Sequence, residues 1–197
     1  MDFRRHWPLV ACGALIAIPV ISYLAKRTAL AGGIGGWRGA MLDRADYHVQ
    51  QHTPYQWGGG HPGMIDSWGL DCSGLIINCA KAAGFVLEWN SGSMWQLLPR
   101  VESPQPADVA LFGYNGKAVH VMLVEDYFPA EGRAACIGAQ GGDSSTVSPA
   151  IAAQMNAYVR RVPDHRKDTR FLGFCSLADI AEGRVSGKAF SGFGSFG

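Results

Sequence analysis

Apolar and polar positions follow two different periods along this chain of 197 residues. In "GWRGAMLDRADYHVQQH", Trp37, Met41, Ala45 and Val49 recur at helical spacing, so the stretch predicts an amphipathic helix. "CSGLIINCAKAAG" predicts a second helix, with Gly84 as its C-cap. The buried stripe of this second helix is expected to consist of Leu75, Ile76, Cys79, Ala80 and Ala83.

The second half of the chain changes to short apolar runs separated by turn residues, which is the pattern of antiparallel strands. The expected strands are "DVALFG", "AVHVMLVEDYF", "AACIGAQ", "AYVRRVP" and "RFLGFCSL". A helix, "SPAIAAQMNA", is expected between the third and fourth strands, and "SGSMWQLLPR" before the first strand predicts a short helix or turn. Helices followed by strands predict an α+β domain with N-terminal helices packed on an antiparallel β-sheet. We place this domain at residues 35–178, ahead of a Gly/Phe-rich C-terminal tail at residues 179–197.

An uncharged apolar run extends from Pro8 to Ala25, between the basic start "MDFRRHW" and Lys26–Arg27. With Trp7 it has about 19 residues, close to the roughly 20 that a helix needs to cross a bilayer. We therefore expect residues 1–31 to form a basic cap and a hydrophobic N-terminal helix that serves as a membrane anchor. Two alternatives stay open: a cleaved signal peptide, because "ALA" at Ala29–Ala31 resembles a cleavage site, and packing inside a larger assembly such as a phage tail.

Composition excludes some classes of function. The formal net charge of +1 gives no electrostatic footprint for nucleic acid. The five cysteines are odd in number and contain no CxxC pair, which supports neither a zinc site nor a disulfide framework. We expect no metal and no cofactor, and most of the cysteines should be buried free thiols.

One cysteine and one histidine have positions suited to catalysis. Cys72 lies at the predicted start of a helix, where unpaired N–H groups and the helix dipole lower the pKa of a thiol. A nucleophilic cysteine also needs a base, and His120 is the histidine inside a predicted strand, where a fixed backbone could direct it at a helix end. Taken alone, the two residues fit a buried thiol and a structural histidine as well as they fit a catalytic pair.

Three blocks of the sequence resemble a known family. "TPYQWGGGHPGMIDSWGLDCSGLI" resembles the signature of the NlpC-like cysteine peptidases of bacterial cell walls, which reads PYxWGG, a short proline-containing loop, then DCSGL. "PQPADVALFGYNGKAVHVMLVEDY" resembles their strand pair, and "CIGAQGGDSST" resembles the strand that supplies a third polar residue. Together the blocks cover most of residues 37–175, in the family's order. The resemblance implies a papain-like NlpC-type domain.

The resemblance also implies roles for individual residues. Cys72 would be the nucleophile and His120 the general base, with a third residue that holds the imidazole tautomer. We choose Gln140 for that third role, because Gly138, two residues earlier on the same face of the strand, has no side chain for it. Tyr55 matches a family tyrosine that lies over the nucleophile and contacts the substrate or the oxyanion.

The neighbours of the nucleophile have more than one possible role. The backbone N–H of Ser73 is a candidate oxyanion donor at a helix end. Asp71 is either part of the substrate or oxyanion site or the N-cap of the helix. Asp108 is expected to order the turn before its strand rather than to take part in chemistry.

The family hydrolyses peptidoglycan stem peptides, typically between D-glutamate and the following diamino acid. The resemblance therefore implies a peptidoglycan endopeptidase that needs no metal. A catalytically silent module that binds cell wall or tail proteins, and a thiol amidase or acyltransferase, are the alternatives. The N-terminal segment implies a protein anchored in the membrane or exported to the cell envelope, or else one in a virion, with membrane or phage tail proteins as its neighbours.

Overall fold

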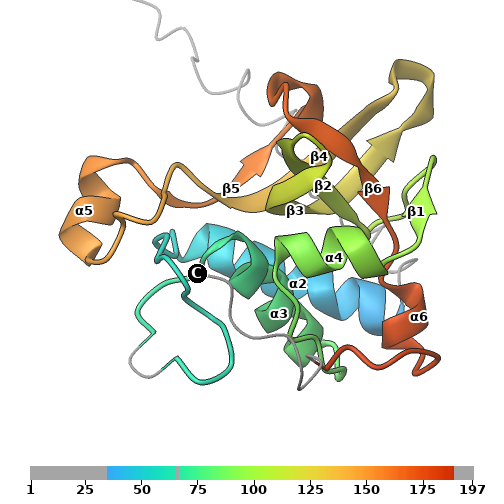
Figure 1. Ribbon diagram of the computed structural model, residues 1–197, viewed down its shortest axis with the longest axis horizontal. Coiled ribbons are helices and arrows are strands. Elements are labelled where there is room, and N and C mark those ends of the chain that lie inside the picture. Colours follow the sequence, from blue (N-terminus) through green and yellow to red (C-terminus); the bar gives the residue numbers. More distant parts are fainter. Residues whose placement is uncertain (1–34, 65–66, 189–197) are drawn as a thin grey trace, which may run out of the picture. The chain divides into compact units, whose positions relative to one another are not determined.

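The computed structural model describes residues 35–64 and 67–188 (Figure 1). The expected hydrophobic helix within residues 1–31 and the last part of the expected tail, residues 189–197, lie outside the described residues. Among the residues that are described, none belongs to a helix long and apolar enough to cross a membrane.

In the described part of the chain, three helices precede the sheet: α2 (Gly36–Gln50), α3 (Cys72–Ala82) and α4 (Ser91–Leu97). The apolar stripe predicted for α2 is confirmed, because Met41 and Ala45 are fully buried and Trp37 packs on the same core. The C-cap of α3 is Ala83, one residue before the predicted Gly84, and Gly84 follows it with a φ of +88° that favours glycine.

Within residues 35–64 and 67–188, six strands form one sheet in the order β1-β6-β2-β3-β4-β5, and every neighbouring pair is antiparallel. The strands are β1 (Arg100–Val101), β2 (Val109–Tyr114), β3 (Lys117–Phe128), β4 (Arg133–Gln140), β5 (Tyr158–Val162) and β6 (Phe171–Cys175). The five expected strands and the expected α+β class are confirmed. The structure adds β1, which pairs with β6 and is too short to leave a periodic pattern.

Short helices lie between the later strands, namely η1 (Pro129–Glu131), α5 (Pro149–Gln154) and η2 (His165–Lys167), and α6 (Ala178–Ala181) follows β6. Helix α5 is the one expected between the third and fourth predicted strands.

The two faces of the sheet carry different apolar clusters. Figure 1 shows α2, α3 and α4 together on one side of the sheet, where Leu75 and Ile76 of α3 belong to the same buried core as Val121 and Leu123 of β3. The alternate residues of β3, Met122 among them, belong to a second cluster on the opposite face. Residues along β3 therefore alternate between the two faces, as the pleat of a strand requires.

The chain continues to pack beyond residue 178. Ile180 of α6 is buried in the main core. Farther along, the backbone N–H of Glu88 donates to the carbonyl of Gly187 over 2.8 Å, and Trp89 Nε1 donates to the carbonyl of Lys188 over 3.0 Å. The folded domain thus includes residues 179–188, past the boundary expected from the sequence.

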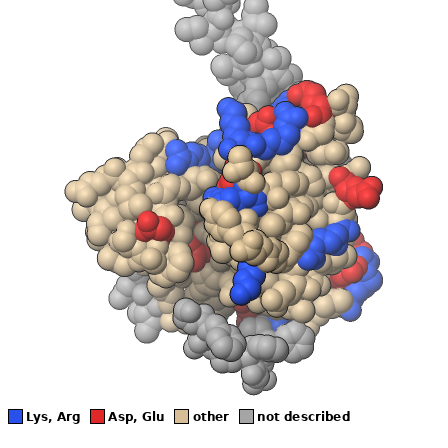
Figure 2. Space-filling model, turned by 45° about the horizontal axis from the view of Figure 1, so that its top comes forward, with Lys and Arg blue, Asp and Glu red and all other residues tan. Residues whose placement is uncertain are grey.

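Charged side chains on the surface form local ion pairs. Arg133 pairs with Glu131 over 2.8 Å, and Arg184 pairs with Asp179 over 2.5 Å. Figure 2 shows the Lys and Arg side chains of one face in several groups, some of them beside Asp or Glu. Asp108 has the ordering role predicted for it, because its carboxylate accepts from the N–H of Gln105 over 2.8 Å and pairs with Arg38 over 3.0 Å.

Candidate active site

A glycine-rich loop and the start of α3 are packed against each other. The N–H of Asp71 donates to the carbonyl of Gly59 over 3.0 Å, and Tyr55 and Leu70 form a β-bridge. A Cβ at Gly74 would overlap the carbonyl oxygen of Gly59. Glycine at position 74, two residues after Cys72, is therefore required by the close approach of two backbones, and this approach fixes where α3 begins.

The carboxylate of Asp71 holds the same junction. Its Oδ1 accepts from the N–H of Gly74 over 2.6 Å and from Ser73 Oγ over 3.1 Å. Its Oδ2 accepts from the N–H of Gly58, in the loop, over 3.1 Å. Of the roles open to Asp71, that of the N-cap of α3 is thus the one the structure shows, although the residue also lines the cavity described next.

The six candidate residues line one cavity of about 910 Å³. They are Tyr55, Asp71, Cys72, Ser73, His120 and Gln140. They come from the loop before α3, from the start of α3, from β3 and from the end of β4. The fold therefore brings together residues that are up to 85 positions apart in the chain (Tyr55 to Gln140).

Cys72 lines this cavity and is buried, with 8% of the residue exposed. Burial, and after it the negative charge of Asp71, raises the pKa of Cys72 to about 12. Backbone N–H groups of Val121, Ser73 and Cys72 itself act in the opposite direction. The resting thiol is neutral at pH 7, and the N–H groups that favour an anion at the sulfur are already in place.

His120 lies next to an irregularity in the sheet. The register between β2 and β3 shifts after Phe112, which pairs with His120, because the following pair is Gly113 with Ala118. Such bulges change the direction of neighbouring side chains and are common next to active sites. Burial, and then the positive charge of Arg170, lowers the pKa of His120 to about 4. The imidazole is therefore neutral at pH 7 and able to accept a proton.

Gln140 contacts His120 directly. Its Nε2 lies 2.8 Å from His120 Nε2 and 2.9 Å from Met122 Sδ. A Cβ at Gly138 would come within 2.7 Å of Met122 Cγ and 2.9 Å of Gln140 Nε2. The missing side chain at position 138 thus provides the space through which Gln140 reaches the histidine.

Tyr55 spans the gap between the loop and the end of β4. Its ring lies so close to Gly142 that a Cβ there would overlap it, and only 4% of the residue is exposed. Burial, and then the charges of Cys72, Asp71 and Asp143, raises the pKa of Tyr55 above its ordinary value. The hydroxyl therefore keeps its proton and remains a hydrogen-bond donor beside the thiol.

Sequence analysis missed several further polar residues of the cavity, among them His61 and Arg170. His61 Nε2 lies 3.1 Å from Asp71 Oδ1 and 3.0 Å from Ser73 Oγ, and Arg170 lines the cavity near His120. His61 stands inside the glycine-rich block and Arg170 just before the last strand, but neither has a pattern that marks its direction. Within residues 35–64 and 67–188, no three His, Cys, Asp or Glu side chains are grouped as a metal site would require.

Comparison with known proteins identifies the family. Residues 52–159, more than half of the chain, match the NlpC/P60 family. This chain belongs to the NlpC/P60 family. The resemblance seen in the three sequence blocks is confirmed, and the matched residues include Tyr55, Cys72, His120 and Gln140.

Individual relatives agree with this assignment. Peptidoglycan endopeptidase RipA of Mycobacterium tuberculosis is 37% identical over 81 residues, which are 36% of this chain and 17% of RipA. A solved NlpC/P60 family protein from Bacillus cereus superposes with a TM-score of 0.51 at 17% identity, over 71% of this chain and 39% of its own. RipD of Mycobacterium tuberculosis is a non-catalytic NlpC/p60 domain protein adapted to peptidoglycan binding. Its structure superposes with a TM-score of 0.51 at 18% identity, over 73% of this chain and 99% of the RipD chain.

These likenesses define the type of domain. The two solved structures share the fold with this chain, and the family match adds a domain of peptidoglycan hydrolase type. The chain spans about one sixth of RipA and less than half of the Bacillus cereus protein.

Proposed function

We propose that the chain is a cysteine peptidase that hydrolyses the amide bond between D-glutamate and the following diamino acid in peptidoglycan stem peptides. One observation carries the proposal: Cys72, His120 and Gln140 line a single cavity, and the Gln140 amide lies 2.8 Å from the imidazole. A nucleophile at a helix start, a neutral imidazole and a residue that orients it are the parts that acyl transfer by a thiol needs.

The first half of the reaction forms a thioester. The Cys72 proton passes to His120 as the sulfur attacks the amide carbon, because the neutral thiol is a weak nucleophile and the neutral imidazole is free to accept. The carbonyl oxygen becomes an oxyanion. When the tetrahedral intermediate collapses, the carbon–nitrogen bond breaks and His120 gives its proton to the leaving amine. The D-glutamyl group stays on the sulfur as a thioester.

The second half restores the thiol. Water gives a proton to His120 and its oxygen attacks the thioester carbon. The carbon–sulfur bond then breaks, the sulfur recovers the proton from His120, and the D-glutamyl carboxylic acid leaves. No redox partner or further reactant is needed for this balance.

Three groups are placed to stabilise the oxyanion. The backbone N–H groups of Cys72 and Ser73 favour negative charge at the nucleophile, and the protonated hydroxyl of Tyr55 lies at the same cavity. Such donors act at the charge that develops during the reaction and are worth about 10²–10³ in rate for a single donor. The proposal thus gives Ser73 and Tyr55 the roles expected from the sequence.

Gln140 sets the tautomer of His120 by the end of the amide it presents. With Nε2 toward the ring, the amide donates to His120 Nε2, and the ring proton lies on Nδ1. A half-turn about the last side-chain bond presents Oε1 instead, which accepts from Nε2–H and frees Nδ1 to take the thiol proton. The same orientation then stabilises the imidazolium, so the base-competent state has the carbonyl end of Gln140 toward His120.

Digestion of purified peptidoglycan, followed by mass analysis of the fragments, tests the proposal. The wild-type chain should release fragments ending in D-glutamate together with fragments that begin with the diamino acid. Cys72→Ala should abolish their release. Cys79→Ala is the matched control, because Cys79 lies in the same helix but is fully buried in the core and outside the cavity. Release of the same fragments by Cys72→Ala would disprove the thiol mechanism.

A catalytically silent module is the second candidate, and RipD gives it a structural precedent. The cavity of this chain favours the enzyme because it contains a thiol, an imidazole and an amide in contact with the imidazole. Binding of peptidoglycan without fragment release by the wild-type chain, combined with equal rates of alkylation at Cys72 and Cys79, would favour the silent module.

The setting of the enzyme is proposed from the sequence alone. The apolar run Pro8–Ala25 would hold the domain at the cell envelope, facing its substrate, and contact with phage tail proteins in a virion is the alternative. Fractionation of cells that express the full chain tests this: recovery with the membrane favours the anchor, and recovery with purified particles favours the virion.

A further inference from the structure

Among the described residues that line the 910 Å³ cavity, Arg170 is the single Lys or Arg. It lies near His120, because its charge is the second largest cause of the lowered pKa of the imidazole. Arg170 also borders an adjoining depression of about 410 Å³, which shares Gln140 with the first cavity and includes Lys167, Thr169 and Tyr114. Lys167 and Arg170 therefore line the space beyond the His120–Gln140 contact, together with Asp168, the carboxylate partner of Arg170.

Arg170 is held in place by its own neighbours. Its Nε donates to Asp168 Oδ1 over 2.9 Å and its Nη2 donates to Asp168 Oδ2 over 2.6 Å. Its carbonyl accepts from the N–H of Gly113 in β2 over 2.8 Å. Because a guanidinium has five N–H donors and Asp168 takes two of them, the pair positions the cation and leaves donors for a ligand.

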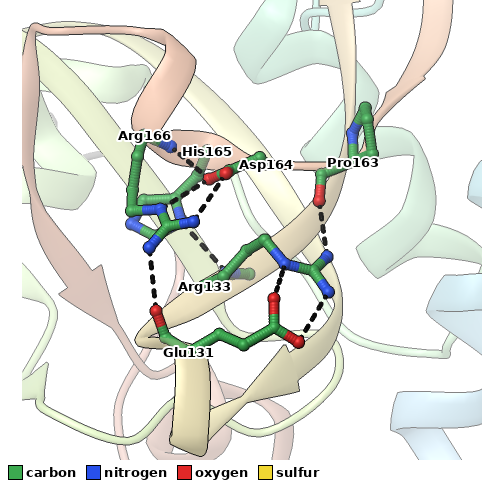
Figure 3. Close-up of polar contacts among 7 residues, drawn as sticks. Glu131, Arg133, Pro163, Asp164, His165 and Arg166 are labelled. Carbon is green, nitrogen blue, oxygen red and sulfur yellow. Dashed lines mark hydrogen bonds and ion pairs between the residues drawn. The ribbon is translucent and has the colours of Figure 1, made fainter.

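The loop that carries Arg170 is fastened to the β3–β4 connection (Figure 3). Arg133 donates to Glu131 and, over 2.8 Å, to the carbonyl of Pro163. Arg166 donates to Asp164 and, over 2.8 Å, to the carbonyl of Glu131. These contacts tie residues 163–166 to η1 and to the start of β4, and the bond from Gly113 ties Arg170 itself to β2, so the cation stands on a braced part of the fold.

Two acidic residues, Asp71 and Asp143, also line the cavity, and hydrogen bonds from Ser145 lower the pKa of Asp143, so its carboxylate is ionised at pH 7. An anionic group of a substrate is therefore attracted toward Arg170 and repelled from these carboxylates.

Proton transfer decides which part of a substrate reaches Arg170. His120 must give its proton to the leaving amine, so the leaving amino acid lies on the His120 side of the broken bond. We propose that Arg170, with Lys167, forms a subsite for a carboxylate carried by the leaving group. This inference rests on the proposed function, and it makes the enzyme selective for a diamino acid with a free α-carboxylate over one that is amidated or extended.

Two synthetic peptides test the subsite: L-Ala-γ-D-Glu-L-Lys and the same peptide as its C-terminal amide. They differ only at the leaving-group carboxylate. We expect the Cys72→Ala chain, measured by calorimetry, to bind the acid at least about tenfold more tightly than the amide, the usual range for hydrogen bonds to a charged group. Adding Arg170→Gln should reduce this ratio to about one, and Arg170→Lys should keep part of it.

Arg184→Gln is the matched control, because Arg184 also pairs with carboxylates but lies beside α6, outside both cavities. It should leave the ratio unchanged. An equal affinity for the two peptides in Cys72→Ala, or a ratio that survives Arg170→Gln, would overturn the subsite. Hydrolysis of the two peptides by the wild-type chain is measured in parallel: its absence would count against the proposed function, while the binding ratio still decides the subsite.

Discussion

The two sides of the cavity are built in different ways. The nucleophile side, named for the proposed role of Cys72, comes from one stretch of chain, residues 54–75, in which a glycine-rich loop contacts the N-cap of α3 just before Cys72. The base side, named for the proposed role of His120, is assembled from β3, β4 and the residues before β6, which only the sheet brings together. The nucleophile side therefore depends on the space between two neighbouring backbone segments, whereas the base side depends on the register of the strands. Substitutions that disturb only one of these two features should affect the two sides differently.

The largest effect is expected on the nucleophile side, from Gly74→Ala. The new Cβ would overlap the Gly59 carbonyl, so the loop and α3 must separate. We expect a loss of about 2–4 kcal/mol in the free energy of unfolding, typical of overpacking that displaces backbone, together with loss of hydrolysis. Urea denaturation and fragment release measure the two losses.

Gly92→Ala serves as the control for that substitution. Gly92 lies in α4, and the nearest atom to its added Cβ is Asn90 Oδ1 at 3.3 Å, a side-chain atom. Alanine in a helix should be neutral or slightly stabilising there. Equal stability of the Gly74 and Gly92 variants would show that the contact between the loop and α3 is not what fixes the nucleophile.

On the base side, acid should reduce stability through His120. Its pKa is about 4 in the folded chain and near 6.5 when unfolded, so the unfolded chain binds more protons between these values. Stability therefore falls as the pH falls from about 6.5 to 4, by up to about 3 kcal/mol from this one group. Urea denaturation at pH 7 and pH 4 measures the loss.

His120→Gln isolates that contribution. Burial also lowers the pKa values of His48 and His165, which remain in both proteins, so the difference between the two acid losses belongs to His120. The variant should lose about 3 kcal/mol less than the wild-type chain between pH 7 and pH 4. Identical losses would mean that His120 is not held neutral by the fold.

Substitution of Gln140 should have a smaller effect than substitution of Gly74 or of His120. Two different replacements can distinguish a role in orienting the His120 imidazole from a role in packing. Gln140→Leu removes the partner of His120 and should lower kcat/KM about 10–100-fold, with little change in stability. Gln140→Glu keeps an oxygen acceptor, so it should recover part of the loss and move the acidic limb of the pH profile upward, because a carboxylate raises the pKa of the imidazole. A profile identical in both variants would assign Gln140 a packing role.

The difference between local contacts and contacts made through the sheet also explains which features could be predicted from the sequence. The periods of α2, α3 and the strands come from burial on one face, which leaves a repeating pattern, and the block around Cys72 is local enough to keep its family signature. Gln140 followed from the resemblance of its block to the family's third block, because Gly138 on the same strand face has no side chain. The space that makes its contact possible depends on Met122 in the neighbouring strand, which the sequence does not place.

The features that were missed depend on contacts between distant segments. His61 reaches Asp71 through the course of a loop, and Arg170 reaches the cavity through the register of β6 against β2. Pairing with β6, rather than any periodicity, makes Arg100–Val101 a strand. The packing of residues 179–188 likewise depends on hydrogen bonds to Glu88 and Trp89, and a glycine-containing segment gives no pattern that predicts them.

Tyr55 belongs to both sides, and its substitution should have the smallest effect. The residue starts in the loop, yet its ring packs against Gly142 after β4. Tyr55→Phe keeps that packing and removes one of three oxyanion donors, so we expect kcat/KM to fall about tenfold, at the low end for such donors because two backbone N–H groups remain. Thermal stability should stay within about 1 kcal/mol of the wild-type value. Unchanged hydrolysis would leave the hydroxyl with no part in the reaction, and a large loss of stability would show that it joins the two sides structurally.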